Sequence, residues 1–135
     1  MTTFAGTPSH ASEEVDVTSV VQAQLEAYNA HDIRAFLATY ASEAEIYEYP
    51  ARLLMKGAAQ IEDDYAHQRF NDTRLHASIV QRFVMENLVV DHERVEITFA
   101  EGPGRLESIV VYEVRDGRIQ RVTLMRGRKI LDPAQ

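Results

Sequence analysis

The chain has 135 residues, a formal net charge of −7 at pH 7 and no cysteine. Its length is that of one domain with its own hydrophobic core, and without cysteine it forms neither a disulfide nor a thiolate nucleophile. Because the charge is negative and no Lys/Arg-rich block occurs, neither nucleic acid nor an anionic membrane is expected as a main partner. No apolar run approaches the roughly 18 residues of a membrane helix. Together with the lack of cysteine, this favours the cytoplasm.

The first residues, MTTFAGTPSHAS, lack the basic start and the apolar centre of a secretory signal. We expect residues 1–14 to form a flexible tail. No repeat, linker or change of composition divides the chain after this tail. The sequence therefore predicts a single domain over residues 15–131 and a short C-terminal tail at 132–135.

The first predicted helix covers residues 16–30, and its apolar residues fall on one face of a helical wheel. They are Val17, Val20, Val21, Leu25 and Tyr28. Gln24 lies near the middle of this face, so its amide must find hydrogen-bond partners or line a wet cavity. Asn29, His31 and Asp32 then interrupt the helix, and Asp32 is a suitable N-cap for a second helix over residues 32–41.

A short alternation of apolar and polar residues predicts a strand at 44–49, which places Glu48 between Tyr47 and Tyr49. A loop through Arg52 and Lys56 then leads to a third helix at 58–70. The rest of the chain reads as strands at 75–83, 88–99, 105–114 and 118–127. Three helices followed by antiparallel strands predict an α+β domain, with the helices packed on one face of a curved sheet.

The stretches VVQAQLEAYNAHDIRAFLATYASEAEIY and YEVRDGRIQRVTLMR, with a glycine-started third helix between them, resemble the nuclear transport factor 2-like superfamily. The most similar members are the bacterial ketosteroid-isomerase-like and SnoaL-like proteins, and the resemblance covers residues 17–129. It implies a cone of curved, mixed or antiparallel sheet that three N-terminal helices close around a deep pocket. It also implies a small-molecule ligand and a homodimer paired through the sheet. Members include enzymes and non-catalytic proteins, so the fold does not settle the function.

The resemblance also suggests roles for individual residues of the isomerase site. Glu48 falls at the position of the general base, where desolvation would raise its pKa. Gln24 falls where the isomerase has its oxyanion-binding tyrosine, and Val110 falls where it has a protonated aspartate. Tyr65 falls at a supporting tyrosine. We therefore predict Glu48, Gln24 and Tyr65 as catalytic residues, although the oxyanion pair is changed.

The strand alternation puts Asp91 and Glu93 on the apolar side of their strand, unless the strand leaves the core or a bulge turns both outward. Facing inward, they could share a proton, bind a cation or, together with Asp64, hold Arg126. If they hold Arg126, the pocket suits a neutral ligand; otherwise Arg126 is available for a carboxylate or phosphate, or it reaches water at the strand end. These charges argue against a steroid. The predicted ligand-binding residues are Tyr28, Tyr40, Asp64, Asp91, Glu93, Val110 and Arg126.

No motif indicates a metal or a cofactor, and we expect neither. His92 follows Asp91 on a strand, so the two side chains point to opposite faces, and no HExxH spacing occurs. Whether the protein is an enzyme stays open on the sequence. The main hypothesis is an isomerase, cyclase or dehydratase that uses Glu48 on a small polar carbonyl compound. The alternatives are a non-catalytic ligand-binding or dimerisation module and an epoxide-opening hydrolase.

Overall fold

The computed structural model describes residues 9–134. The helices are α1 (Ser9–Ala30), α2 (Ile33–Ala38) and α3 (Ala58–His67), and a 3-10 turn, η1, follows at Arg69–Asn71. The strands are β1 (Tyr40–Glu48), β2 (Arg52–Lys56), β3 (His76–Met85), β4 (Leu88–Phe99), β5 (Gly102–Arg115), β6 (Arg118–Arg126) and β7 (Ile130–Leu131). No helix in this part of the chain is long and apolar enough to cross a membrane.

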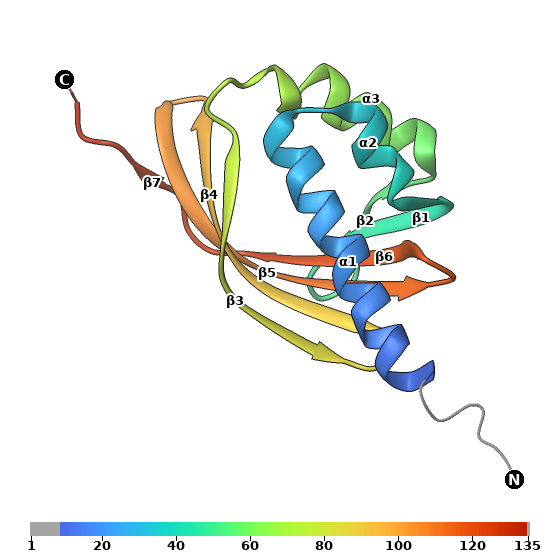
Figure 1. Cartoon of the computed structure of the whole chain (residues 1–135). Helices are drawn as coiled ribbons and strands as arrows, with labels where there is room; N and C mark the ends of the chain where they lie inside the picture. The colour runs from blue at the N-terminus through green and yellow to red at the C-terminus, as the bar shows by residue number, and fades with distance from the viewer. Residues whose placement is uncertain (1–8, 135) are drawn as a thin grey trace, which may run out of the picture.

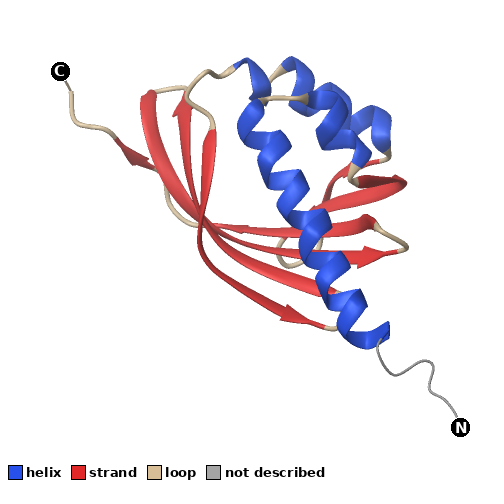
Figure 2. Cartoon of the chain, viewed as in Figure 1, coloured by secondary structure: helices blue, strands red, loops and turns tan. Residues whose placement is uncertain are grey.

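The seven strands form one curved sheet in the order β2-β1-β6-β5-β4-β3, and β7 pairs with β5. Neighbouring strands are antiparallel, except that β1 and β6 run parallel. The helices lie over one face of this sheet, with α1 crossing it and α2 and α3 packed at one end (Figures 1 and 2). The predicted α+β architecture with a curved mixed sheet is confirmed.

Several predicted boundaries differ from the structure. The segment around Arg52 and Lys56, predicted as a loop, is strand β2, which pairs with β1 at the edge of the sheet. Its five residues, RLLMK, are too short for a clear alternation, so only the pairing reveals the strand. The second helix ends at Ala38, because the chain already enters β1 at Tyr40. Helix α1 begins at Ser9 and so takes in part of the predicted tail.

The break between α1 and α2 fixes how α1 sits against the sheet. His31 has a φ of 56°, and Asp32 caps α2 by accepting a hydrogen bond from Ala35 N at 3.1 Å. Just before the break, the Asn29 amide donates to Ala77 O at 2.9 Å and accepts from Ala77 N at 2.8 Å. Since β3 is an edge strand, Asn29 satisfies backbone groups that would otherwise lack a partner. This contact joins the C-terminal end of α1 to the edge of the sheet.

The core between the helices and the sheet contains a cluster of aromatic rings. Phe36 is fully buried and lies 4.6 Å from Tyr65 and 5.0 Å from Tyr40, measured between ring centroids. Tyr28 packs against Phe36 at 6.3 Å and Phe70 at 5.9 Å. Offset and edge-on contacts of this kind are favourable beyond the area that they bury. The cluster therefore makes a rigid wall and places three tyrosines at its edge.

Candidate functional site

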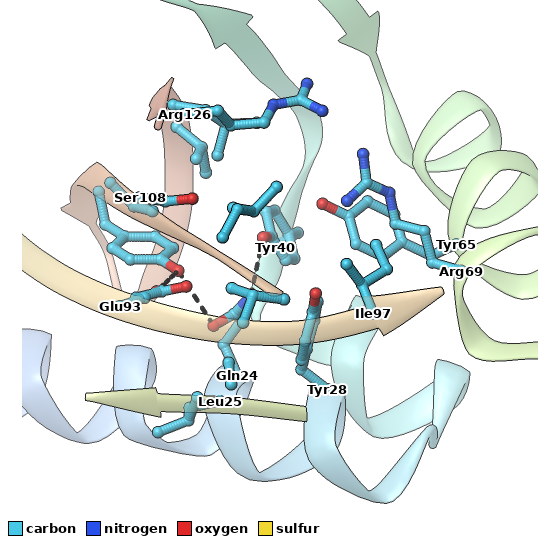
Figure 3. Close-up of a pocket in the computed structure, with 17 residues that line it drawn as sticks. Gln24, Leu25, Tyr28, Tyr40, Tyr65, Arg69, Glu93, Ile97, Ser108 and Arg126 are labelled. Atoms are coloured by element: carbon cyan, nitrogen blue, oxygen red, sulfur yellow. Dashed lines mark hydrogen bonds between the residues drawn. The ribbon is translucent and has the colours of Figure 1, made fainter. Parts of the chain in front are cut away.

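A cavity of about 80 Å³ lies between α1, α3 and the concave face of the sheet (Figure 3). One water needs on the order of 10–15 Å³ measured in this way, so several waters or a small ligand can enter. The polar residues among those that line it are Gln24, Tyr28, Tyr40, Tyr65, Arg69, Glu93, Ser108, Tyr112 and Arg126. The remaining lining is mostly aliphatic, which is the usual character of a small-molecule site.

Four buried polar side chains form a hydrogen-bond chain on one side of the cavity (Figure 3). Tyr112 Oη lies 3.1 Å from Glu93 Oε2 and 3.4 Å from Gln24 Oε1. The amide nitrogen of Gln24 donates to Tyr40 Oη at 3.3 Å. Gln24 was expected either to find hydrogen-bond partners or to line a cavity, and in the structure it does both.

Glu93 provides the carboxyl group of this hydrogen-bond chain. Burial raises its pKa from 4.5 to about 7, and the negative charge of Asp91 adds to the rise. The hydrogen bond from Tyr112 and the charge of Arg82 oppose the rise but do not cancel it. A carboxyl group with this pKa is present in both protonation states near neutral pH, which is the condition for a general acid or base.

The tyrosines around the cavity keep their protons. Burial is the largest cause of a raised pKa at Tyr28, Tyr40, Tyr65 and Tyr112. Their phenol groups therefore stay neutral at physiological pH and can donate hydrogen bonds to a carbonyl oxygen. Tyr40 accepts the Gln24 amide bond, so its own proton is available toward the cavity that it lines.

Two arginines line the cavity on the side away from Glu93 and Gln24 (Figure 3). Arg69 Nε donates to Asp64 Oδ2 at 3.0 Å, and its guanidinium lies 5.1 Å from the centroid of the Tyr65 ring. Arg126 Nε lies 3.8 Å from Glu48 Oε2. The side chain of Arg126 is 35% exposed, so this side of the cavity reaches solvent.

The prediction that Glu48 faces the pocket with a raised pKa is wrong. Glu48 does not line the cavity, and the hydrogen bond from Arg52 Nη2, at 2.6 Å, lowers its pKa. Glu48 does share its strand phase with buried Ile46, as predicted. It is, however, the last residue of β1, and the register with β2 sets Arg52 opposite it. At the strand end, Glu48 therefore contacts solvent and the Arg52 guanidinium and does not face an apolar cleft.

Asp91 faces inward as predicted, but it is not a cavity residue. It is 1% exposed, and Arg82 binds it through Nε at 2.6 Å and Nη2 at 2.9 Å. A register shift between Ile79 and Gln81 changes the phase of β3, so Arg82 meets Asp91 on the buried side. The same inward phase brings Glu93 to the cavity, so the alternative in which both acids turn outward is wrong.

Most of the predicted site residues line the cavity, and a few lie outside it. The cavity brings together Gln24, Tyr28, Tyr40, Tyr65, Glu93, Val110 and Arg126, all of which were predicted. Asp64 stays outside its lining and pairs with Arg69. Among the described side chains no cluster of three or more potential metal ligands occurs.

Two functional candidates were missed in the sequence. Tyr112 shares the strand phase of Val110, so the alternation of β5 could have found it. Arg69 lies in η1, after the third helix, and no periodicity in the sequence indicates its direction. Their contacts make both residues functional candidates: Tyr112 bonds to Glu93, and Arg69 contacts Asp64 and Tyr65.

Solved structures with the same fold carry varied functional names. An LEH-like epoxide hydrolase from M. tuberculosis has a TM-score of 0.73 at 15% identity, covering 85% of this chain and 85% of that chain. A candidate ketosteroid isomerase from Kribbella flavida has a TM-score of 0.71 at 16% identity, covering 91% and 86%. A candidate polyketide cyclase from Sinorhizobium meliloti has a TM-score of 0.65 at 21% identity, covering 78% and 93%. At these identities the likeness concerns the fold alone.

The family comparison is more specific than these structural likenesses. No curated protein sequence matches the chain significantly. The model of the SnoaL-like domain matches residues 21–122, which run from α1 through most of β6. This span includes most of the cavity lining, with Arg126 beyond its end. The chain therefore belongs to the SnoaL-like domain family, within the nuclear transport factor 2-like superfamily.

Proposed function

We propose that the protein is an acid–base enzyme that acts on a small polar carbonyl compound, with Glu93 as the group that moves the proton. The observation that carries this proposal is the Glu93 carboxyl group, buried at a cavity, bonded to Tyr112 and with a pKa of about 7. Buried carboxyl groups with such values are concentrated at catalytic sites. Glu93 takes the role for which the sequence favoured Glu48.

The proposed step is proton abstraction next to a carbonyl group. The Glu93 carboxylate takes the proton from the α-carbon, and the C–H electron pair moves toward the carbonyl oxygen to give an enolate. The Tyr40 hydroxyl, which accepts from Gln24 and keeps its proton, donates to that oxygen. Glu93 then returns the proton to carbon, at the same or another position. Isomerisation, cyclisation and elimination can all begin from such an enolate.

The size and polarity of the cavity favour a compact substrate. A volume of about 80 Å³, bordered by two arginines and four tyrosines, suits a small hydrogen-bonding molecule better than a steroid. A wholly apolar ligand would desolvate these groups without giving them partners. This supports the expectation, drawn from the sequence, that steroids are poor ligands.

Hydrogen–deuterium exchange at carbon tests the proposal without knowledge of the natural substrate. The purified protein is incubated in D₂O with cyclopentanone and with 4-oxopentanoate, and loss of the α-proton signal is followed by NMR. We expect Glu93→Gln to lower the protein-dependent rate by about 10²–10⁴-fold, the usual contribution of a general base. The matched control Glu48→Gln, an acid outside the cavity, should exchange like the wild type.

Two results would contradict the proposed proton transfer by Glu93. If Glu48→Gln abolishes exchange and Glu93→Gln does not, the base assigned here is wrong. If the wild type exchanges neither ketone faster than buffer, the proposed enolisation is wrong, and the alternative of a non-catalytic ligand-binding module gains. Circular dichroism of each variant checks that the fold is intact.

A further inference from the structure

We propose that Arg126 and Arg69 form an anion subsite at the solvent side of the cavity, and that the carbonyl compound bound there carries a carboxylate. This inference rests on the proposed function, because it names the substrate class of the same site. Both guanidinium groups border the cavity, and the positive charges of both oppose the rise in the Tyr65 pKa that burial causes. Two positive charges thus act on one side of a small cavity in a chain of net charge −7.

Among the side chains that the structure describes, the acids leave Arg126 incompletely paired. Its nearest acidic partner is Glu48, at 3.8 Å, whereas a direct charge-assisted hydrogen bond is about 2.7–2.9 Å long. Glu48 makes its shorter contact, 2.6 Å, with Arg52. A ligand carboxylate could therefore approach Arg126 closely without displacing an established partner.

Arg69 is positioned more firmly and retains donors. The bond from its Nε to Asp64 and its place over the Tyr65 ring fix the plane of the guanidinium. An arginine has five N–H donors, and Asp64 takes the one on Nε. The donors on its two terminal nitrogens remain for a ligand. Arg69 can therefore act as a fixed donor beside the more exposed Arg126.

The two remaining inward acids are bound elsewhere. Asp91 is held in a bidentate pair by Arg82, and Glu93 accepts from Tyr112. These contacts exclude the hypothesis that Asp91 and Glu93 neutralise Arg126, which would have suited the pocket to a neutral ligand. Of the alternatives that the sequence left open for an inward Arg126, the structure favours binding of an external anion.

The charge distribution also orients the ligand. Figure 3 shows Glu93 and Gln24 on one side of the cavity and both guanidinium groups on the other. A carboxylate is repelled by ionised Glu93 and attracted by the arginines, so it points toward solvent. The carbonyl group of the same molecule then lies toward Tyr40 and Glu93, as the proposed proton transfer requires. The expected substrates are small oxo-carboxylates.

Binding of a matched pair of probes tests this subsite. Isothermal titration calorimetry at fixed ionic strength measures 4-oxopentanoate and its neutral amide, 4-oxopentanamide. We expect the carboxylate to bind the wild type at least tenfold more tightly than the amide. Arg126→Gln should weaken carboxylate binding by about 10–100-fold, the usual cost of losing a charged hydrogen bond, and leave amide binding unchanged.

Arg128→Gln is the matched control, because it removes the same charge two positions further along, outside the cavity lining. It should bind the carboxylate like the wild type. Arg69→Lys, which keeps a charge but loses the planar donor, should weaken carboxylate binding and leave amide binding unchanged. Equal affinities for the two probes, no binding of either, or equal losses in Arg126→Gln and Arg128→Gln would each overturn the subsite.

The subsite and the proposed chemistry can fail separately. Arg126-dependent carboxylate binding without α-proton exchange would support the subsite and reject the role of Glu93. If the wild type exchanges cyclopentanone as fast as 4-oxopentanoate, and Arg126→Gln does not slow either, the chemistry holds and the subsite is wrong.

Discussion

The hydroxyl group of Tyr112 lies 3.1 Å from Oε2 of Glu93, and Gln24 Oε1 is a second acceptor at 3.4 Å. One hydroxyl proton cannot serve both acceptors. When Glu93 is ionised, Tyr112 donates to the carboxylate, since charge-assisted bonds are the stronger ones. When Glu93 is protonated, it can donate to Tyr112, which can then donate to Gln24. The protonation state of Glu93 therefore sets which acceptor the Tyr112 hydroxyl serves, while the Gln24 amide donates to Tyr40 in both states.

Tyr112→Phe should raise the pKa of Glu93 further. The lost hydrogen bond stabilises the carboxylate, and a bond to a charged group is worth about 1.5–3 kcal/mol, or roughly 1–2 pKa units. The acidic limb of the exchange rate against pH should move to higher pH by that amount. Tyr40→Phe is the control: Tyr40 bonds Gln24, so this variant should lower the rate without moving the limb. An unmoved limb in Tyr112→Phe would contradict the assignment of Glu93.

Glu93 should also make the protein less stable as pH rises. Its pKa is raised from 4.5 to about 7 on folding, so the folded state binds the proton more tightly than the unfolded state. Below pH 4.5 both states are protonated and the folded protein carries no penalty. Between pH 4.5 and 7 the penalty grows to about 3 kcal/mol. Urea unfolding of wild type and Glu93→Gln across this range measures it: their difference should change with pH, and a constant difference would refute the prediction.

The ion pair between Asp91 and Arg82 should contribute to stability rather than to catalysis. Asp91 is buried, and removing one partner of a buried pair typically costs about 3–5 kcal/mol. We expect Asp91→Asn to lower the free energy of unfolding by an amount in this range, measured by urea denaturation. Glu107→Gln, which loses exposed contacts with His92 and Arg94, should keep near wild-type stability. Equal effects of the two substitutions would show that burial of the pair is unimportant.

The fold was predictable because its signals are local. The apolar stripe of α1, the Asp32 cap and the strand alternation each follow from neighbouring residues. The site was only partly predictable, because it depends on where strands end and shift register. Glu48 has the correct phase but sits at a strand end, and Arg82 meets Asp91 only after a bulge in β3. Contacts of this kind join distant segments, and no periodicity encodes them.

Asn29 should be important for stability although its own side chain does not line the cavity. Its side chain completes both backbone hydrogen bonds of Ala77 on the edge strand β3. In Asn29→Ala the N–H and C=O of Ala77 lose these partners, at a cost of about 2 kcal/mol in unfolding free energy. Asn71→Ala, which loses one exposed bond to His67 O, is the control and should change it by less than about 0.5 kcal/mol. A similar, small loss in both variants would contradict the proposed role of Asn29.

The outer face of the sheet bears on the predicted homodimer, which stays a prediction. Phe83 pairs across the strands with Val90, and Val90 with Val111, on the face opposite the helices. Ile109 and Met125 lie beside this row. Phe83 is 58% exposed and Met125 43%, so the row is an apolar surface that the described residues of the chain leave uncovered.

A second copy of the chain, paired through this face, would bury the row on both protomers at once. Light scattering at micromolar concentration should therefore give the mass of a dimer. Phe83→Glu places a charge within the contact, at the β3 end of the row, and should shift the mass toward the monomer. Ile130→Glu, a substitution at an exposed apolar residue of β7, should leave it unchanged. A monomeric wild type, or equal dissociation by both variants, would rule out pairing through this row.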